Sequence, residues 1–402
     1  MRVLIFTAHI SPYHDARYVG AKSYIDDLHV VSVLNEGDFP QFLAESVGSY
    51  RLHRLYKSKA DYTKEVAAGK LKRRVHNLLT ELNPELVVVS GWANPESIIA
   101  IGYAFGAGIP VVLMSESQAD DSRRSPLREW VKKQLVSTVS AALVGGPSHR
   151  DYLVSLGLSK DSIFLGYNAV DNVHFQSNLS KSRSAMESMG TELPTHYILA
   201  SARFIPKKNL DTLIRAYGDA LTKCSNIPDL VILGDGQERR RIEETIHESD
   251  LANRVHLLGF QGYQALPYLY GTASAFIHVS TSEQWGLVIN EAMAASLPVI
   301  ASEACGATRT MITDGINGLV CAPDVESISN AVVRLFNMSD EQRAMMGEAA
   351  LLKVRDWGPD RFGSGLKSAV DYANSTKKHR KLAAVSRVIM FFLQRSIFDD
   401  VA

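Results

Sequence analysis

The stretch YILASARFIPKKNLDTLIRAYGDA, residues 197–220, decides how the second half of this chain folds. It opens with a short apolar run and continues into a helical pattern that begins near Asn209. Such a pair is typical of a parallel strand buried on both faces and the helix that follows it. The turn between them carries Arg203 and Lys208 beside the expected helix N-terminus, where free N–H groups and the helix dipole favour negative charge. The turn therefore predicts a phosphate or diphosphate site, with a solvated basic turn as the alternative.

The same alternation of strand and helix extends along the chain in both directions. In the first half, apolar runs predict strands at 3–7, 28–33, 86–90, 111–114 and 141–144. In the second half, the series restarts with predicted strands at 197–201, 230–233, 255–258, 275–278 and 298–301. The fold class is therefore α/β, with two Rossmann-like, doubly wound parallel-sheet domains facing a central cleft. In such folds ligands bind beside the carboxyl ends of the strands, so we expect function in the loops that follow strands.

Length and composition agree with two ordinary globular domains. A chain of 402 residues exceeds what one hydrophobic core spans, and its 46% hydrophobic and 21% charged residues argue against disorder. A polar stretch near 177–194 separates the two series, so we expect an N-terminal, acceptor-binding domain at 1–178 and a C-terminal domain at 179–360. Residues 361–402 are predicted to form a helical segment that packs back on the N-terminal domain or touches a membrane.

Charge and cysteine content narrow the class of protein. The 43 Lys and Arg residues balance 43 Asp and Glu residues, so no global field attracts nucleic acid. Three cysteines are too few, and odd in number, for a disulfide framework, which favours a reducing, cytoplasmic location. Polar residues interrupt the N-terminus too early for a signal peptide, and no apolar run approaches the roughly 20 residues of a membrane span. We expect a cytoplasmic protein, either soluble or peripheral at the inner face of the plasma membrane.

A second polar cluster is the sequence EQWGLVINE, residues 283–291, in which Glu283 and Glu291 stand 291 − 283 = 8 positions apart. The first acid is expected in a loop and the second in the following helix, so both can be aimed at one ligand. Ionised carboxylates only accept hydrogen bonds, which suits the hydroxyls of a ribose or a sugar, and Gly286 lets the backbone approach closely. Two solvated acids are the plain alternative. The alternative with a catalytic role is a glycosidase, but that reaction requires a protonated acid and an ionised partner around a scissile bond.

Taken together, the two clusters resemble the family 4 glycosyltransferases, retaining enzymes of the two-domain GT-B architecture. The family pattern of Arg, four residues and Lys is met by Arg203 and Lys208, and the later pattern of Glu, seven residues and Glu by Glu283 and Glu291. Three smaller motifs of the family also have counterparts, which are Asn168 to Asp171 (with Ala169 in place of the usual Gly), Gly234 to Gly236 and Asp314 to Gly318. The resemblance covers nearly all of residues 195–360.

The resemblance implies transfer of a sugar from a nucleotide-diphospho-sugar to an acceptor hydroxyl with retention of configuration, in polysaccharide or glycolipid assembly. It implies that Arg203 and Lys208 neutralise the leaving diphosphate, that Glu291 binds the ribose and that Glu283 holds the donor sugar. Further donor-binding positions implied by the resemblance are Gly234, Gly236, Trp285, Gly286, Leu287 and Val288. The chain has no Asp-x-Asp sequence with which other glycosyltransferases hold a divalent ion, so activity without metal or cofactor is expected.

The first domain departs from better-known members of the family on its expected acceptor side. The usual Gly-Gly loop is replaced by HISPYHDAR, residues 9–17, in which His14 and Arg17 are candidates for acceptor or phosphate contacts or belong to a solvated loop. Glu116 stands where many relatives place a His that meets the donor sugar, so we expect a catalytic carboxylate there. The alternative for Glu116 is an ion pair with Arg123 or Arg124. Trp92 is expected either to stack on a sugar or to be a buried anchor.

Two basic segments have membrane-facing and solvated interpretations. Residues 122–133 mix basic and aromatic side chains, and the basic run 377–381 precedes an apolar pattern, so each could lie on an anionic membrane or form an ordinary helix face. Three isolated histidines are expected to be structural rather than metal ligands, namely His149, His174 and His278.

Fold alone does not fix the reaction, and two other functions remain open from the sequence. One is a different enzyme on this architecture, a nucleotide-sugar 2-epimerase or a glycan phosphorylase. The other is a non-catalytic nucleotide-sugar-binding protein.

Overall fold

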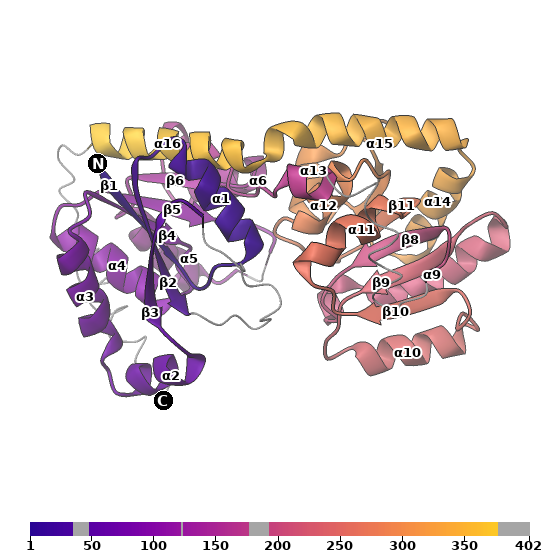
Figure 1. The fold of residues 1–402 in the computed structure, drawn as a ribbon, viewed down its shortest axis with the longest axis horizontal. Helices are drawn as coiled ribbons and strands as arrows, with labels where there is room; N and C mark the ends of the chain where they lie inside the picture. Colours follow the sequence, from indigo (N-terminus) through magenta and orange to yellow (C-terminus); the bar gives the residue numbers. More distant parts are fainter. Residues whose placement is uncertain (35–47, 122–123, 177–192, 377–402) are drawn as a thin grey trace. The chain divides into compact units, whose positions relative to one another are not determined.

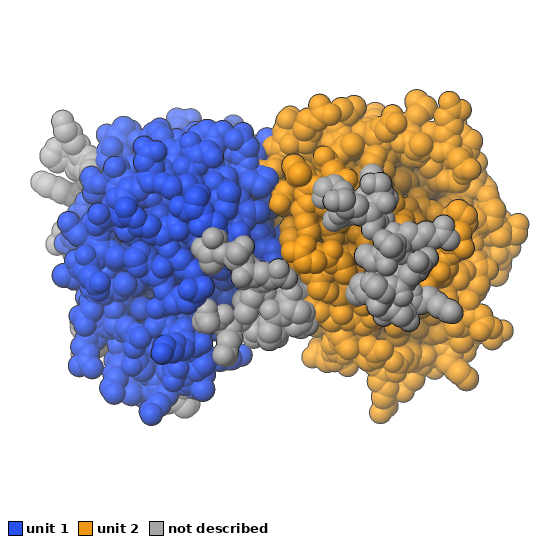
Figure 2. All heavy atoms as spheres, viewed as in Figure 1, with its two compact units in different colours: residues 1–169, 359–402 blue, residues 170–358 orange. Residues whose placement is uncertain are grey.

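The computed structural model describes residues 1–34, 48–121, 124–176 and 193–376. The chain forms two compact units, residues 1–169 with 359–402 (unit 1) and residues 170–358 (unit 2), which are coloured separately in Figure 2. Each unit has its own parallel sheet and its own hydrophobic core. The units are therefore described one at a time.

Unit 1 is built on a seven-stranded parallel sheet in the order β3-β2-β1-β4-β5-β6-β7. Its strands are β1 (Arg2–Thr7), β2 (Asp27–Leu34), β3 (Arg51–Tyr56), β4 (Leu86–Ser90), β5 (Val111–Ser115), β6 (Ala141–Val144) and β7 (Ile163–Leu165). Successive side chains of a strand point to opposite faces, so Leu4 and Phe6 enter one core layer while Val3 and Ile5 enter the other. Apolar runs buried on both faces are thus satisfied by helices on both sides of the sheet (Figure 1).

The helices of unit 1 are α1 (Pro12–Lys22), α2 (Lys59–Ala67), α3 (Leu71–Leu82), α4 (Pro95–Gly106), α5 (Pro126–Val136), α6 (Pro147–Ser155) and α16 (Pro359–Ser375). The last of these, drawn in yellow in Figure 1, returns from the far end of the chain and packs beside α1. Their contact is backbone to backbone, because a Cβ placed on Gly363 would lie 2.6 Å from the carbonyl oxygen of Gly20. Phe362 and Leu366 of α16 complete one core layer of unit 1.

Unit 2 has a six-stranded parallel sheet in the order β10-β9-β8-β11-β12-β13. Its strands are β8 (Tyr197–Ser201), β9 (Asp229–Leu233), β10 (Val255–Gly259), β11 (Ala275–His278), β12 (Val299–Ser302) and β13 (Leu319–Cys321). Its helices are α7 (Asn172–Gln176), α9 (Leu210–Lys223), α10 (Arg239–Glu248), α11 (Leu266–Gly271), α12 (Leu287–Ala294), α13 (Gly306–Met311), α14 (Val325–Phe336) and α15 (Asp340–Val354).

Both sheets have one point at which the strand order reverses. In unit 1 this switch lies between β1 and β4, and in unit 2 between β8 and β11. In sheets of this type the loops that leave the two central strands diverge at the switch, and ligands bind there, beside the carboxyl ends of the strands. In unit 2 those loops are residues 202–209 and 279–286, the two segments that carry the sequence motifs.

The predicted fold class is confirmed, with strand ends shifted by no more than one or two residues. Gly69 at φ +66° separates α2 from α3. Strands β3, β7 and β13 were not predicted. The sequence of β3, RLHRLY, is polar because it lies at the sheet edge, and the other two strands have three residues each.

The domain boundary is earlier than predicted from the polar stretch. The chain passes from unit 1 to unit 2 between Ala169 and Val170, within the Asn168 to Asp171 motif, rather than at 178/179. It returns at Pro359, and α16 belongs to unit 1. The segments 177–192 and 377–402, which hold most of the polar stretch and the basic tail, lie outside the described residues.

Candidate active site

The two basic and acidic motifs of unit 2 meet at its topological switch. Lys208 ends a short 3-10 turn after β8, and its ammonium group is in contact with the Glu283 carboxylate from the loop after β11. The side chains of Lys208 and Glu283 are only 11% and 14% exposed. Arg203 lies in the same β8 loop with its side chain exposed, and within the described residues it has no ion-pair partner. The site therefore combines a largely buried, paired cation, Lys208, with an available one, Arg203.

The Glu283 carboxylate is surrounded by donors. The hydroxyl of Ser280 donates to it at 3.4 Å, His278 Nε2 lies 3.7 Å away and Lys207 Nζ 3.9 Å away. Burial alone would raise the pKa of Glu283, but the contact with His278 and the charge of Lys208 outweigh it and hold the pKa well below its usual range. Glu283 is therefore a fixed anion and a hydrogen-bond acceptor, not a general acid.

The two glycines of the Gly234 to Gly236 motif pack against the backbone of the Arg203 loop. Both have positive φ, +121° and +154°, and a Cβ on Gly236 would lie 2.6 Å from the carbonyl oxygen of Phe204. A Cβ on Gly234 would overlap the carbonyl oxygen of Ala202. This close approach allows Phe204 N–H to donate to the Asp235 carbonyl at 2.8 Å. The two glycines thus position the backbone of the Arg203 loop, and direct donor contact by them stays a prediction.

The Glu283 loop is held in a similar way. Gly286 begins α12 in the left-handed conformation, at φ +98°, and its missing side chain leaves room beside Glu283 Cγ. Backbone bonds link this loop to the start of α13, with Gly306 N–H donating to the Glu283 carbonyl at 3.2 Å. A Cβ on Gly306 would overlap the carbonyl oxygen of Gln284. Gly306 is thus a supporting residue that the sequence motifs did not identify.

Glu291 lies on α12, as predicted, and is 1% exposed. The hydroxyl of Tyr270 on α11 donates to its Oε2 at 2.7 Å. Leu287 and Val288, in the first turn of α12, are partly buried. The helix therefore offers its first-turn backbone at the switch while its fifth residue, Glu291, is fixed by a tyrosine. A role for Glu291 at a ribose remains a prediction.

The side chain of Trp285 is part of the core of unit 2. It is 2% exposed, its ring stacks on Trp357 at 5.1 Å between centroids, and its Nε1 donates to Asn290 Oδ1 at 2.8 Å. Only the backbone of Trp285 is thus left for the predicted donor contact. The ring anchors the loop.

In unit 1 the predicted acceptor-side residues gather at the switch between β1 and β4. His14 and Arg17 lie on α1, directly after the β1 loop, and Trp92 lies in the loop after β4. Trp92 is partly buried and packs against the core layer of that face, which favours the anchor interpretation. Arg17 is 4% exposed and so does not belong to a solvated loop.

His14 caps α1. Its Nδ1 accepts from Ser11 N–H at 3.3 Å, and Ser11 Oγ accepts from His14 N–H at 3.4 Å, which is a capping box with His in the usual Glu or Gln position. Burial, Arg17 and His9 lower the pKa of His14 to about 3. The ring is therefore neutral near pH 7, with its other nitrogen, Nε2, carrying the proton.

This shift predicts acid sensitivity. Between pH 6.5 and pH 3 the unfolded chain binds a proton at His14 that the folded chain does not, so acid favours unfolding by at most about 1.4 kcal/mol per pH unit. His14→Gln keeps a capping acceptor and removes this titration. We expect urea unfolding of the variant to lose less stability from pH 7 to pH 4 than that of the unchanged chain. Parallel stability profiles would contradict the assignment.

Glu116 follows β5 and is partly buried. Its carboxylate accepts a hydrogen bond from the Asn168 side chain, in the segment that precedes the crossing to unit 2. The alternative ion pair with Arg124 is wrong, because that guanidinium contacts Asp121 at 2.6 Å and Glu129 at 3.3 Å. Arg123 lies outside the described residues. A catalytic role for Glu116 stays a prediction.

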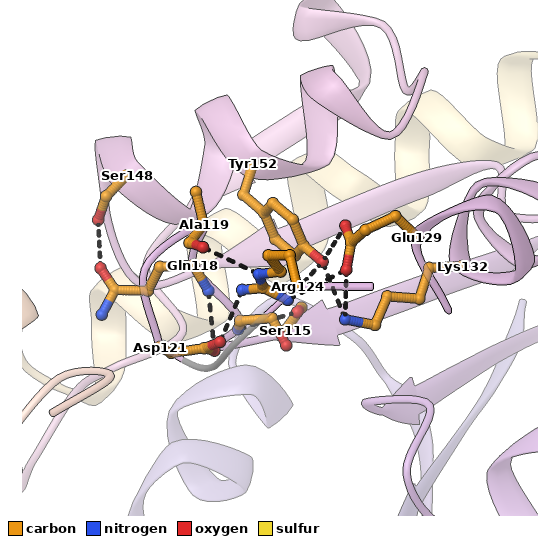
Figure 3. A network of polar contacts seen from close by, with 10 residues as sticks. Ser115, Gln118, Ala119, Asp121, Arg124, Glu129, Lys132, Ser148 and Tyr152 are labelled. Atoms are coloured by element: carbon orange, nitrogen blue, oxygen red, sulfur yellow. Dashed lines mark hydrogen bonds and ion pairs between the residues drawn. The ribbon is translucent and has the colours of Figure 1, made fainter. Parts of the chain in front are cut away.

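Figure 3 shows the polar network that holds the loop after Glu116. Arg124 also donates to the hydroxyl of Tyr152 at 2.8 Å and stands 4.4 Å from the centre of that ring. Lys132 and Glu129 of α5 join the same hydroxyl, so loop and helix are tied to α6. Several charges of the basic segment 122–133 are thus structural. The opposite face of α5 stays exposed, including Leu127 at 70% and Trp130 at 46%.

The three isolated histidines have protein partners. His149 accepts from Gly146 N–H at 3.1 Å, His174 stacks on Tyr263 at 4.1 Å, and His278 contacts Ser280 at 3.1 Å. Across the ranges that the structure describes, no three His, Cys, Asp or Glu residues come together as a metal cluster would. Within the same ranges, every helix is too short or too polar to cross a membrane.

Comparison with protein families matches residues 187–353 to the model described as "Glycosyl transferases group 1". Among curated proteins, the chain is similar to alpha-D-kanosaminyltransferase of Streptomyces kanamyceticus, with 24% identity over 271 residues that cover 64% of this chain and 69% of that protein. It is also similar to a GDP-mannose-dependent monoacylated alpha-(1-6)-phosphatidylinositol monomannoside mannosyltransferase of Corynebacterium glutamicum. That match has 28% identity over 210 residues and covers 50% of this chain and 53% of the relative.

Solved structures with the same fold cover nearly the whole chain. Anabaena Alr3699/HepE, in complex with UDP and glucose, superposes with a TM-score of 0.71 at 20% identity and covers 92% of this chain and 99% of its own. Sucrose-phosphate synthase from Thermosynechococcus elongatus superposes with a TM-score of 0.69 at 18% identity and covers 91% and 97%. Residues 187–353 thus match the glycosyl transferases group 1 model, and the chain has the GT-B fold of these solved structures.

Proposed function

We propose that the chain transfers a sugar from a nucleotide-diphospho-sugar to an acceptor hydroxyl with retention of the anomeric configuration, as family 4 enzymes do. The observation that carries the proposal is the meeting of Lys208 and Glu283 at the unit 2 switch, beside the available guanidinium of Arg203. Side chains 283 − 208 = 75 positions apart are brought into contact at the place where this fold binds ligands.

Sugar transfer from a nucleotide-sugar requires positive groups near the diphosphate as it leaves. A nucleoside diphosphate gains negative charge as its bond to the sugar breaks, and donors fixed in advance lower that barrier most. Lys208 is fixed by its contact with Glu283, and Arg203 adds a second positive group in the same loop. Glu283, held as an anion, accepts hydrogen bonds from sugar hydroxyls, and Glu291 accepts those of the ribose.

Within this proposal no residue of the chain acts as a nucleophile. A phosphate oxygen of the donor takes the proton of the acceptor hydroxyl on the face from which the diphosphate leaves. Glu116, with its carboxylate held by Asn168, supports the positive charge that develops at the reacting carbon. Arg203 and Lys208 supply the countercharge that a divalent metal provides elsewhere, so the reaction is proposed to need no metal.

The proposed acceptor is a glycan or a lipid-linked sugar in polysaccharide or glycolipid assembly. The exposed face of α5 supports contact with an anionic membrane surface, because the apolar Leu127 and Trp130 stand beside the exposed basic residues Arg128 and Lys133. The name of the Corynebacterium glutamicum relative includes a phosphatidylinositol monomannoside, which agrees with a lipid-linked acceptor.

A donor screen tests the proposal. We expect one among UDP-, GDP-, ADP- and dTDP-sugars, at about 100 times its dissociation constant, to stabilise the chain by about 2.7 kcal/mol. Glu291→Gln should reduce that stabilisation, and EDTA should leave both binding and transfer unchanged. NMR of the product should show the donor's anomeric configuration.

Other outcomes of the same screen favour other functions. An isomer of the donor sugar indicates a 2-epimerase, and a requirement for inorganic phosphate indicates a phosphorylase. Donor binding without turnover on any acceptor pool indicates a non-catalytic binding protein. If none of the four donor classes binds, the proposal is wrong.

A further inference from the structure

A group of polar side chains, all buried except the partly buried Ser90, lies in unit 1 where β1, β4 and β7 end. We call it the Arg17 cluster, and its members are Thr7, Arg17, Tyr18, Ser90 and Tyr167. Thr7 and Ser90 are the last residues of β1 and β4, and the other three come from α1 and the segment after β7. The cluster therefore lies at the switch point of unit 1, where this type of sheet binds ligands.

Arg17 is a buried cation with an unused donor. Its Nε donates to the carbonyl oxygen of Ala169 at 2.9 Å, and its Cζ stands 5.3 Å from the centre of the Tyr167 ring. Its Nη2 is buried and has no hydrogen-bond partner, although the side chain is only 4% exposed. Among the described residues no carboxylate forms an ion pair with it. Within the part of the chain that the structure describes, the charge is thus removed from water without an anion in return.

The hydroxyl of Tyr18 is the second unused group. Tyr18 is 1% exposed, and its Oη is buried without a hydrogen-bond partner. Burial raises the pKa of Tyr18 to about 12, while the hydroxyls of Thr7 and Ser90 and the charge of Arg17 act in the opposite direction. These three groups therefore lie near the tyrosine hydroxyl, and at neutral pH that hydroxyl is a proton donor.

The nearby acids are engaged elsewhere. Glu116 accepts from Asn168, and Asp15 of α1 accepts from the hydroxyl of Tyr50 at 2.7 Å and from Gly48 N–H at 3.0 Å. His14, one turn before Arg17, is neutral and uses Nδ1 in the helix cap. A buried cation without an anion and a buried hydroxyl without an acceptor each cost free energy. Both costs are removed by a single ligand oxyanion placed between them.

We propose that Arg17 and Tyr18 bind an oxyanion, a phosphate or carboxylate group, that is carried by the glycosyl acceptor. That the anion belongs to an acceptor rests on the proposed transferase function, whereas the anion site itself does not. Both donors are covered in the unliganded chain, so entry of the anion is coupled to a local opening of the loop between β1 and α1. The substrate class is then an anionic glycan or a phosphorylated glycolipid rather than a neutral sugar.

Calorimetric titration of the full chain at constant ionic strength tests the site, with inorganic phosphate, glucuronate and methyl glucoside as probes. All titrations use a chain with the substitution Arg203→Leu, called the background, because this change removes the available cation of unit 2. We expect phosphate or glucuronate to bind and methyl glucoside not to bind. Which of the two anions binds more tightly distinguishes a phosphate from a carboxylate on the acceptor.

Two variants then locate the bound anion. Arg17→Leu should weaken anion binding about 100-fold and Tyr18→Phe about 10-fold, because each removes a charge-assisted hydrogen bond. Arg51→Leu is the matched control, since Arg51 is 68% exposed and begins β3 at the opposite end of the strands, and it should bind like the background. Tyr18→Phe should also leave the melting temperature of the free chain unchanged or raise it, because the hydroxyl has no partner to lose.

The proposal is overturned if neither anion binds the Arg203→Leu background. It is equally overturned if Tyr18→Phe lowers the stability of the free chain while leaving anion affinity intact, because both residues are then structural. If Arg17→Leu fails to fold, Tyr18→Phe alone still tests whether the anion binds at the Arg17 cluster. Nucleotide sugars are not used in these titrations, so failure of the donor screen and failure of the anion site remain separate results.

Discussion

Replacement of Lys208 by Met should lower kcat/KM for sugar transfer by about 1000-fold. The ammonium group is expected to meet the diphosphate as its charge grows, and loss of one fixed donor of this kind costs 100- to 1000-fold. The substitution also strands the Glu283 carboxylate, which loses its closest cation and is 14% exposed. Because the loss arises in the transition state, kcat should fall more than donor affinity. Steady-state kinetics together with calorimetric donor binding measure the two effects separately.

Lys207→Met is the matched control for this experiment. Lys207 is the preceding residue and carries the same charge, but its Nζ lies 3.9 Å from Glu283 and its side chain is 42% exposed. A screened surface contact of this kind contributes at most about 1 kcal/mol, so we expect less than a tenfold change. Equal losses in the two variants would mean that net charge, rather than the fixed position of Lys208, supports transfer.

Replacement of Gly234 by Ala should be the most destabilising single methyl addition in unit 2. The residue has φ +121°, which side chains rarely adopt, and its Cβ would overlap the carbonyl oxygen of Ala202, a backbone atom that cannot rotate away. We expect a loss of about 3 kcal/mol or more in the free energy of urea unfolding. Donor binding should weaken with it, because the Arg203 loop rests on this contact.

Gly106→Ala provides the comparison. Gly106 ends α4, and a Cβ there would meet nothing within 4 Å, so this change should be neutral or slightly stabilising. If Gly234→Ala unfolds at the same urea concentration as Gly106→Ala, the close packing of residues 234–236 beneath the Arg203 loop does not support the site.

Much of the fold was predictable because its strands are buried on both faces. Apolar runs such as Leu86–Ser90 and Tyr197–Ser201 can be predicted as strands from their own sequence, without knowledge of the neighbouring strands. The structure confirms both runs to the residue. The edge strand Arg51–Tyr56 mixes polar and apolar residues and gave no such signal. The return of α16 to unit 1 was one of two predicted alternatives, the other being contact with a membrane, because the apolar face of an amphipathic helix suits either surface.

The site in unit 2 was predictable in part because its residues follow strands at fixed spacings. Supporting residues carry no such pattern. Tyr270, which holds Glu291, and Gly306, which carries the Glu283 loop, become meaningful only when distant segments meet. Tyr18 was missed for a related reason, since a tyrosine on an amphipathic helix is indistinguishable from a core residue until its hydroxyl is found without a partner.

The interleaved course of the chain bears on how the protein is made. Unit 2 is one uninterrupted segment. Unit 1, in contrast, is completed by α16, which follows unit 2 in the sequence. A ribosome therefore delivers residues 170–358 complete while the groove beside α1, later filled by Phe362 and Leu366, is still open. Nascent chains halted before residue 359 should be recognised by chaperones through that apolar surface, and extension of the chain through α16 should end the recognition.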